Sequence, residues 1–251
     1  MRVVKTVAAL AVVAASAVGC GVAVSGTAVP APNLKPRPLF GATVQRVLLD
    51  NVDLSRLFAQ TFVTREGADV GGPDKLYDVL RSQDGCLGVT AMLQKSVYQS
   101  ADVRDLAAEE WWNNGDPAQV VGVMEGVVTL PSAAQAQQMF AQFSQQWQRC
   151  NGMTTSEQSG PVNTTNAISD VRLADPSVIA ATKLASSVIP NLPPLRPSPE
   201  ARALGVRSNC LVDVEVVFFN GRRPSDPGTA DLSTSAVEVA HAMMDKVTAL
   251  G

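Results

Sequence analysis

Four cysteines and one histidine are the residues of this sequence that could do the most distinctive chemistry. Cys86, Cys150 and Cys210 can form one disulfide in an oxidising compartment, and their spacing alone does not decide which two pair. His241 would have to serve any Ser-His-Asp triad or histidine-ligated zinc site. It lies one residue away from the apolar stripe of the last predicted helix, so we interpret it as a boundary residue of that helix. The sequence therefore predicts no catalytic residue, no metal site and no cofactor.

Cys20 ends an apolar segment that begins after Arg2 and Lys5. A charged start and a short apolar run are typical of a secretory signal and are too short for a permanent membrane span. The small residues 17–19 before Cys20 also resemble the lipobox of bacterial lipoproteins, although Ala17 stands where leucine is usual. We expect Cys20 to carry lipid, palmitate included, and to tether the chain to a membrane surface. The alternative is an ordinary signal that is cleaved elsewhere.

Trp111 and Trp112 suggest a ligand contact. The segment 102–112 is interpreted as a helix, on which adjacent side chains cannot both face one core. One ring is then expected near the surface or a groove, where it could contact a sugar or a lipid. A helix end packed across a seam is the alternative.

The overall charge and composition limit the function and the domain organisation. The formal net charge is −3, and no basic cluster exists, which excludes nucleic acid as a partner. Residues 1–19 form the predicted lipoprotein signal, and the Pro-rich segment 20–38 is predicted to be a flexible tether. Residues 39–251 are enough for a single domain with a buried core.

The segment 129–152 predicts an amphipathic helix with both ends marked. Ser132 and Gln135 can form a capping box, and Asn151-Gly152 can end the helix with a left-handed residue. Apolar residues recur every three or four positions and define one face: Ala136, Phe140, Phe143, Trp147 and Cys150. The apolar segment 120–130 before this helix predicts a strand.

The C-terminal part of the chain predicts a strand followed by a helix. In 210–218, one face carries Cys210 and three valines, while Asp213 and Glu215 on the other face predict that it is partly wet. The segment 235–250 predicts a second long helix, begun by a Ser235–Glu238 capping box. By contrast, 154–166 is polar with little pattern, and 178–189 is apolar and ambiguous. This order favours an α+β fold, with an antiparallel sheet flanked by helices around a cleft.

The order and spacing of several motifs resemble the PknH-like extracellular sensor domain, found in mycobacterial-type Ser/Thr receptor kinases and in stand-alone lipoproteins. The resemblance covers 39–251. Its motifs are Cys86 followed by Tyr98, the 120–130 strand running into Pro131-Ser132-Ala133, Trp147 three residues before Cys150, the 202–209 segment before the 212–216 strand, and the terminal 236–247 helix. The family implies an antiparallel sheet flanked by helices around a large cleft that takes an extracytoplasmic ligand.

The family also implies two disulfides, and this sequence departs from that pattern. Cys86 and Cys150 fit the first pair. Glu200 stands where a cysteine of the second pair is expected, and Cys210 occupies a position typical of a branched aliphatic residue. We therefore predict a Cys86–Cys150 disulfide and a buried free thiol at Cys210.

The signal, the tether and the resemblance together predict a non-enzymatic, membrane-anchored extracytoplasmic protein that binds a ligand or acts as a sensor. It would lie on the cell membrane and take a small molecule, glycan or lipid in a mainly apolar cleft. An envelope protein is a further candidate partner. The alternative is a periplasmic carrier of lipid or glycolipid, and an enzyme is the third reading.

Overall fold

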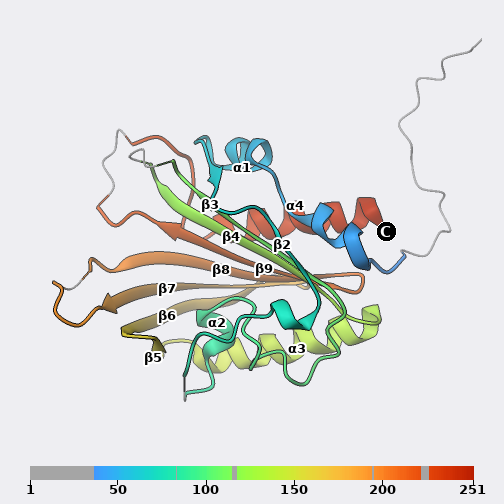
Figure 1. Cartoon of the computed structure of the whole chain (residues 1–251), viewed down its shortest axis with the longest axis horizontal. Coiled ribbons are helices and arrows are strands. Elements are labelled where there is room, and N and C mark those ends of the chain that lie inside the picture. Colours follow the sequence, from blue (N-terminus) through green and yellow to red (C-terminus); the bar gives the residue numbers. More distant parts are fainter. Residues whose placement is uncertain (1–36, 83, 115–117, 194, 222–225) are drawn as a thin grey trace, which may run out of the picture. The chain divides into compact units, whose positions relative to one another are not determined.

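The computed structural model describes residues 37–82, 84–114, 118–193, 195–221 and 226–251. The predicted signal, Cys20 and all of the predicted tether before Arg37 lie outside this part of the chain. The described residues form a nine-stranded antiparallel sheet with the order β1-β3-β4-β9-β8-β7-β6-β5, and β2 also pairs with β3 (Figure 1). The strands are β1 (Val63–Thr64), β2 (Asp69–Gly71), β3 (Leu106–Trp112), β4 (Val120–Thr129), β5 (Thr154–Ser159), β6 (Val162–Asp175), β7 (Val178–Val188), β8 (Ser198–Arg207) and β9 (Cys210–Phe218).

Helices cover both faces of this sheet, which confirms the predicted α+β fold. One face packs against α4 (Ser235–Leu250), α1 (Asn51–Phe58) and the 3₁₀ helix η1 (Gly41–Val47). The other packs against α3 (Ala133–Cys150) and the short α2 (Leu87–Thr90). Figure 1 shows α1 and α4 on one side of the strands and α2 and α3 on the other. We call these the α4 face and the α3 face. The 3₁₀ turn η2 (Pro73–Lys75) lies in the connection before α2.

Helix α3 confirms the predicted periodicity, the N-cap at Ser132 and the left-handed end at Gly152, but the Gln135 half of the capping box is not formed. The Ser132 hydroxyl accepts a hydrogen bond from the backbone N–H of Gln135 at 3.3 Å, and Gly152 has a φ of +78°. The predicted apolar face is buried: Ala136, Phe140, Phe143, Trp147 and Cys150. The helix therefore lies on the sheet by the face that the sequence marks.

Helix α4 is also confirmed, but its predicted capping box is wrong. The N-cap residue is Thr234, whose side chain makes no capping hydrogen bond. Ser235 is the first helical residue, and its hydroxyl accepts a hydrogen bond from the backbone N–H of Asp231 at 2.8 Å. The buried stripe lies where it was predicted.

The segment with the two tryptophans is a strand and not the predicted helix. Residues 106–112 form β3, which pairs with β4 from Leu106↔Val128 to Trp112↔Gly122. Adjacent side chains of a strand point to opposite faces of the sheet, so Trp111 and Trp112 are separated by the sheet itself. The polar segment 154–166 and the ambiguous 178–189 are strands too, because pairing in a long β5-β6-β7 meander outweighs their weak local preference.

The first described residues are fastened beside the turn between β8 and β9. The buried Asn209 side chain accepts a hydrogen bond from the Leu39 backbone N–H at 2.8 Å and donates to the carbonyls of Leu39 at 3.0 Å and Leu130 at 2.9 Å. The Arg37 N–H donates to the carbonyl of Gly251 at 3.0 Å. The start of the domain therefore lies against its C-terminus.

Candidate ligand-binding cavity

A cavity of about 300 Å³ lies on the α3 face, between the sheet and the segment 77–94. Strands β4 to β9 supply its floor, and the loop that includes α2 supplies its roof. The floor residues are Met124, Glu157, Thr164, Asn166, Lys183, Ala185, Ser187, Glu200 and Glu215, and the roof residues are Tyr77, Leu80, Thr90, Ala91, Met92 and Gln94. The floor carries polar and charged side chains, while Met124 and the roof residues Leu80 and Met92 add apolar surface, so the mainly apolar cleft stays a prediction.

The floor is organised by a lysine between two glutamates. Lys183 Nζ lies 2.7 Å from Glu200 Oε2 and 3.1 Å from Glu215 Oε2, and Lys183 also donates to the Thr90 carbonyl of the roof. Burial alone would lower the pKa of Lys183, but Glu215 and Glu200 outweigh burial and raise it, so the side chain stays charged. Burial raises the pKa of Glu200, against the opposing effect of Lys183.

A second ion pair lies directly beside the first. Arg202 is fully buried, and its Nη2 lies 2.8 Å from Asp213 Oδ1 while its Nη1 lies 3.7 Å from Glu215 Oε2. Burial raises the pKa of Asp213, while Arg202 opposes the shift. The five residues Lys183, Glu200, Arg202, Asp213 and Glu215 form what we call the charged cluster. Asp213 and Glu215 are thus 2% and 6% exposed, and the prediction of a wet strand face is wrong.

The charged cluster also holds the roof in place. Arg202 Nε donates to the Val89 carbonyl at 3.2 Å, Arg202 Nη2 approaches the Gly88 carbonyl at 3.5 Å, and Asp213 Oδ2 accepts from the Leu93 N–H at 3.2 Å. Arg202 and Lys183 thus donate to carbonyls of α2 that have no partner within the helix. The guanidinium also lies 5.7 Å from the ring centroid of Trp147 on α3. Floor and roof are therefore one hydrogen-bonded unit.

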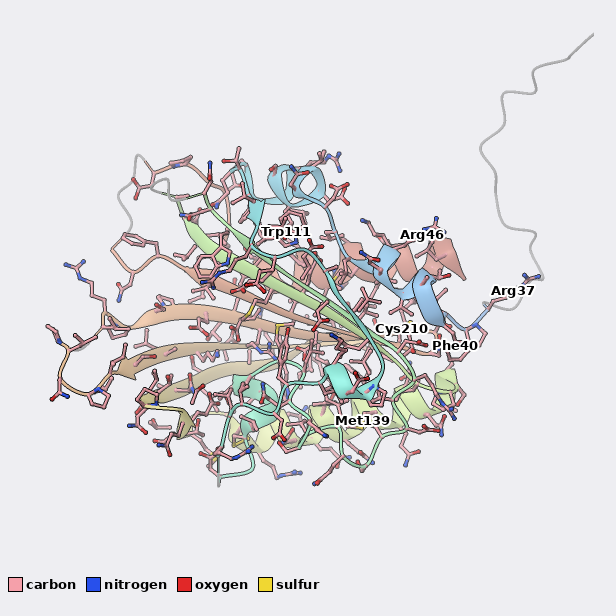
Figure 2. All side chains as sticks on the ribbon, viewed as in Figure 1. Arg37, Phe40, Arg46, Trp111, Met139 and Cys210 are labelled. Atoms are coloured by element: carbon pink, nitrogen blue, oxygen red, sulfur yellow. A yellow bond between two sulfur atoms is a disulfide. The ribbon has the colours of Figure 1, made fainter. Side chains whose placement is uncertain are left out.

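The disulfide fixes the other end of α2. Cys86 directly precedes α2 and is bonded to Cys150, the last residue of α3, with a Cα–Cα distance of 5.8 Å. This confirms the predicted pair. Cys210 is free and buried on the α4 face, as predicted, and burial raises the pKa of its thiol to about 12. Figure 2 labels Cys210 within the sheet and Met139 on α3.

Two buried polar side chains, one in the floor and one beside it, lack the partners that burial normally requires. Asn166 is fully buried, and neither its Nδ2 nor its Oδ1 has a hydrogen-bond partner among the described residues. Thr155, directly opposite Asn166 in the β5–β6 pair, has an unpartnered hydroxyl in the same part of the structure. Glu157 is 6% exposed and accepts a hydrogen bond from the Thr90 hydroxyl, but it pairs with no cation of the described chain.

The two predicted tryptophan contacts lie outside this cavity. Trp111 is buried on the α4 face, where its Nε1 donates to Glu125 Oε1 at 2.9 Å, and Figure 2 labels it below α1. Trp112 is half-buried on the opposite face, with the Arg65 guanidinium 5.1 Å from its ring centroid. A ligand contact by either ring stays a prediction. His241 Nε2 lies 2.6 Å from Asp175 Oδ2 at the surface, in keeping with its interpretation as a boundary helix residue.

The charged cluster was missed because its members come from three strands. Asp213 and Glu215 alternate with buried valines, Arg202 lies between two buried alanines of β8, and Lys183 lies between a threonine and a leucine of β7. Opposite charges at matching positions of neighbouring predicted strands were the available signal.

The comparisons with known proteins agree with this architecture. A family model of the PknH-like extracellular domain matches residues 39–246. The crystal structure of the extracellular domain of PknH from Mycobacterium tuberculosis shares the fold with a TM-score of 0.66 at 16% identity, over 85% of this chain and 98% of that chain. An uncharacterized protein from Mycobacterium smegmatis gives a TM-score of 0.35 at 10% identity, over 82% and 96%, and is too different to inform the fold. No curated protein matches the chain.

Two further observations concern location. The matching family is one of extracellular domains, which fits an extracytoplasmic location. Within the described part of the chain, no helix combines the length and the apolar character needed to cross a membrane. With the family match spanning most of the sequence and the fold of the solved domain shared, the chain belongs to the PknH-like extracellular domain family.

Proposed function

We propose that this protein is a membrane-anchored, extracytoplasmic sensor-type protein that captures a small polar ligand in the cavity between the sheet and α2. The observation that carries the proposal is the buried charged cluster. Buried ion pairs contribute little net stability and are often replaceable by apolar residues. A cluster that lines a cavity is better explained by recognition than by folding.

The size and the floor of the cavity favour a sensor over the alternative of a lipid carrier. A volume of about 300 Å³ is at the small end of ligand cavities, and its floor carries Glu157, Lys183, Glu200 and Glu215. An acyl chain placed there would desolvate these charges without replacing their hydrogen bonds. A small polar molecule would instead add partners.

Native mass spectrometry of the full chain, purified from a host that processes lipoproteins, tests ligand capture. We expect a discrete adduct that denaturation releases. The Lys183→Met/Glu200→Leu variant should lose the adduct. This double substitution leaves no lone buried charge, because Glu215 still has Arg202 beside it. The control is Arg104→Met/Asp102→Leu, which removes an exposed ion pair. An adduct kept by the first variant, or a bare mass for the unaltered protein, would contradict the proposal.

Anchoring through Cys20 rests on the sequence and has its own test. Cells expressing the chain are labelled with a radioactive fatty acid, and the protein should carry the label. The Cys20→Ala variant should not. Label that survives this substitution would show that the lipid is attached elsewhere, and an unlabelled protein would remove the anchor from the proposal.

A further inference from the structure

Glu157 is the carboxylate of the cavity that the charged cluster leaves without a cation. Lys183 is occupied by Glu200 and Glu215, and Arg202 by Asp213. Among the described residues, only the Thr90 hydroxyl donates a hydrogen bond to Glu157, whose exposed fraction is 6%. A charged group so far removed from water is costly unless a partner compensates it. The missing partner has positive charge.

Asn166 is a second residue of the cavity that lacks a partner within the described chain, and it adds a requirement for hydrogen-bonding groups on the ligand. It lies on β6 two residues from Thr164, the residue directly opposite Glu157, so Asn166 and Glu157 are diagonal neighbours on one face of the sheet. Its amide offers two donors and an acceptor, and neither Nδ2 nor Oδ1 has a partner among the described residues. Buried amides are almost always paired, so this one fits a ligand with both a donor and an acceptor.

The surrounding charge favours a cation as well. The cavity is lined by three glutamates and one lysine: Glu157, Glu200, Glu215 and Lys183. Tyr77 also lines a neighbouring hollow of about 250 Å³, whose charged residues are Arg65, Glu66, Asp69, Glu109 and Glu110. Acidic walls at low dielectric attract cations and repel anions over several ångströms.

We propose that the cavity binds a small amino alcohol, whose ammonium group pairs with Glu157 and donates to Asn166 Oδ1 while its neighbouring hydroxyl accepts from Asn166 Nδ2. This inference rests on the proposed function and names the chemical class of its ligand. A free amino sugar and free ethanolamine both present this chemistry. The volume of about 300 Å³ admits a molecule of monosaccharide size.

Isothermal titration calorimetry on the full chain, with four probes, tests the class of ligand. Glucosamine is compared with glucose, and ethanolamine with ethylene glycol, so that each pair differs by its ammonium group. We expect the ammonium probe to bind at least about tenfold more tightly than its neutral partner, because a buried, hydrogen-bonded charge pair contributes more free energy than a tenfold change requires. Binding by glucosamine alone would identify an amino sugar, and binding by ethanolamine alone would identify a small acyclic amino alcohol.

Two variants place the ammonium in the cavity. Glu157→Gln keeps an acceptor for Thr90 but removes the charge, and Asn166→Ala removes both amide groups. Each substitution should lower the affinity for the preferred probe by about tenfold or more. Asp245→Asn removes an exposed carboxylate from α4 and should leave binding unchanged. Melting temperatures without probe show whether each variant is folded. If Glu157→Gln is unstable, the ratio of the glucosamine affinity to the glucose affinity in Asn166→Ala still tests the proposed contact.

The outcomes separate this inference from the proposed function. Equal binding of charged and neutral probes would overturn the proposal of an amino alcohol ligand. So would the absence of binding by either ammonium probe at about 50 mM, a concentration that still detects the weakest specific complexes. If native mass spectrometry nevertheless finds a neutral or anionic adduct, the cavity binds a ligand of another class and the proposed function stands. If no adduct and no probe is found, both fall.

Discussion

Strand β9 has two buried faces that differ in chemistry. Toward α4 it presents Cys210, Val212, Val214 and Val216, which lie in one apolar core with η1, α1 and α4. Toward α3 it presents Asp213 and Glu215, which are as deeply buried but paired with Arg202 and Lys183. Apolar burial on the first side stabilises the fold in proportion to its area. Charge burial on the second contributes little net stability and sets a geometry instead.

The comparison teaches that burial alone does not reveal why a residue is inside. Glu125 is a fully buried carboxylate on the α4 face, but it serves structure: it accepts from the Leu49 N–H at 3.1 and 3.0 Å and from Trp111. It fastens the end of η1 to the sheet and lines none of the cavities described above. On the α3 face, Glu157, Glu200 and Glu215 line a cavity. Variants of the two faces should therefore behave differently.

The largest effect is expected for Arg202→Met, on the charged side. It leaves Asp213 without its partner and uncaps the Val89 carbonyl, and we expect the free energy of unfolding to fall by about 5 kcal/mol, the upper end for breaking a buried pair. Urea unfolding measures the loss. In the double variant Arg202→Met/Asp213→Leu, roughly half or more of it should return, because no lone charge remains. A double variant as unstable as the single one would show that the pair itself supports the fold.

Removal of the disulfide should have the next largest effect. Cys86→Ser/Cys150→Ser opens a loop of 64 residues and should lower the free energy of unfolding by about 4 kcal/mol in the chain-entropy model. It should also weaken ligand binding, because α2 loses its attachment to α3. Cys210→Ala, the control on the α4 face, should lower stability by about 1 kcal/mol and leave binding unchanged. Intact binding in the double serine variant would mean that the charged cluster alone positions the roof.

An apolar substitution on the α4 face should affect stability only. Met243 is fully buried on α4, and Met243→Ala should lower the free energy of unfolding by about 3 kcal/mol through lost burial and the resulting cavity. Met124→Ala, in the partly exposed floor of the α3 face, should lower it by about 1 kcal/mol or less but change ligand affinity. Calorimetry measures ligand affinity and thermal unfolding measures stability, and both are applied to the two variants. The same pattern of losses for both methionines would erase the distinction between the faces.

A pH dependence spread over several pH units originates in Glu125. Burial raises the pKa of Glu125 from 4.5 to about 8, against hydrogen bonds from Leu49 and Trp111. Between these pH values the folded state holds a proton that the unfolded state has lost, so its stability is full below pH 4.5 and is lost as the pH rises through about 8. The slope is at most about 1.4 kcal/mol per pH unit.

Urea unfolding of Glu125→Gln across this range is the measurement. The variant keeps an acceptor for Leu49 and Trp111 but cannot titrate, so its stability should be flatter with pH than that of the unaltered protein. Glu238→Gln, an exposed substitution on α4, should retain the original slope. Equal slopes in all three proteins would assign the pH dependence to the charged cluster.

Much of the scaffold could be predicted because its signals are local. The stripes of α3 and α4, the alternation along β9 and the family motifs specify which residues face a core. The charged cluster depends on register, which is a non-local property. The turn at Ser208-Asn209 places Arg202 opposite Glu215, and this register could have been predicted from the sequence of the turn. Lys183 lies opposite Glu200 across an irregular, Pro-rich connection, and no local pattern fixes that register. Reading 102–112 as a helix also hid the separation of Trp111 from Trp112.

The Asn209 contacts to Leu39 and Leu130 have a mechanical consequence. A pull on the residues before Arg37 loads first the hydrogen bonds that join Leu39 to Asn209 and Arg37 to Gly251. Asn209 lies in the turn between β8 and β9, and β9 is bonded along its length to β4 and β8. The force therefore spreads into the centre of the sheet, where Arg202 of β8 and Asp213 of β9 hold the roof of the cavity. Tension on a tether attached at this point would reach the floor and the roof together.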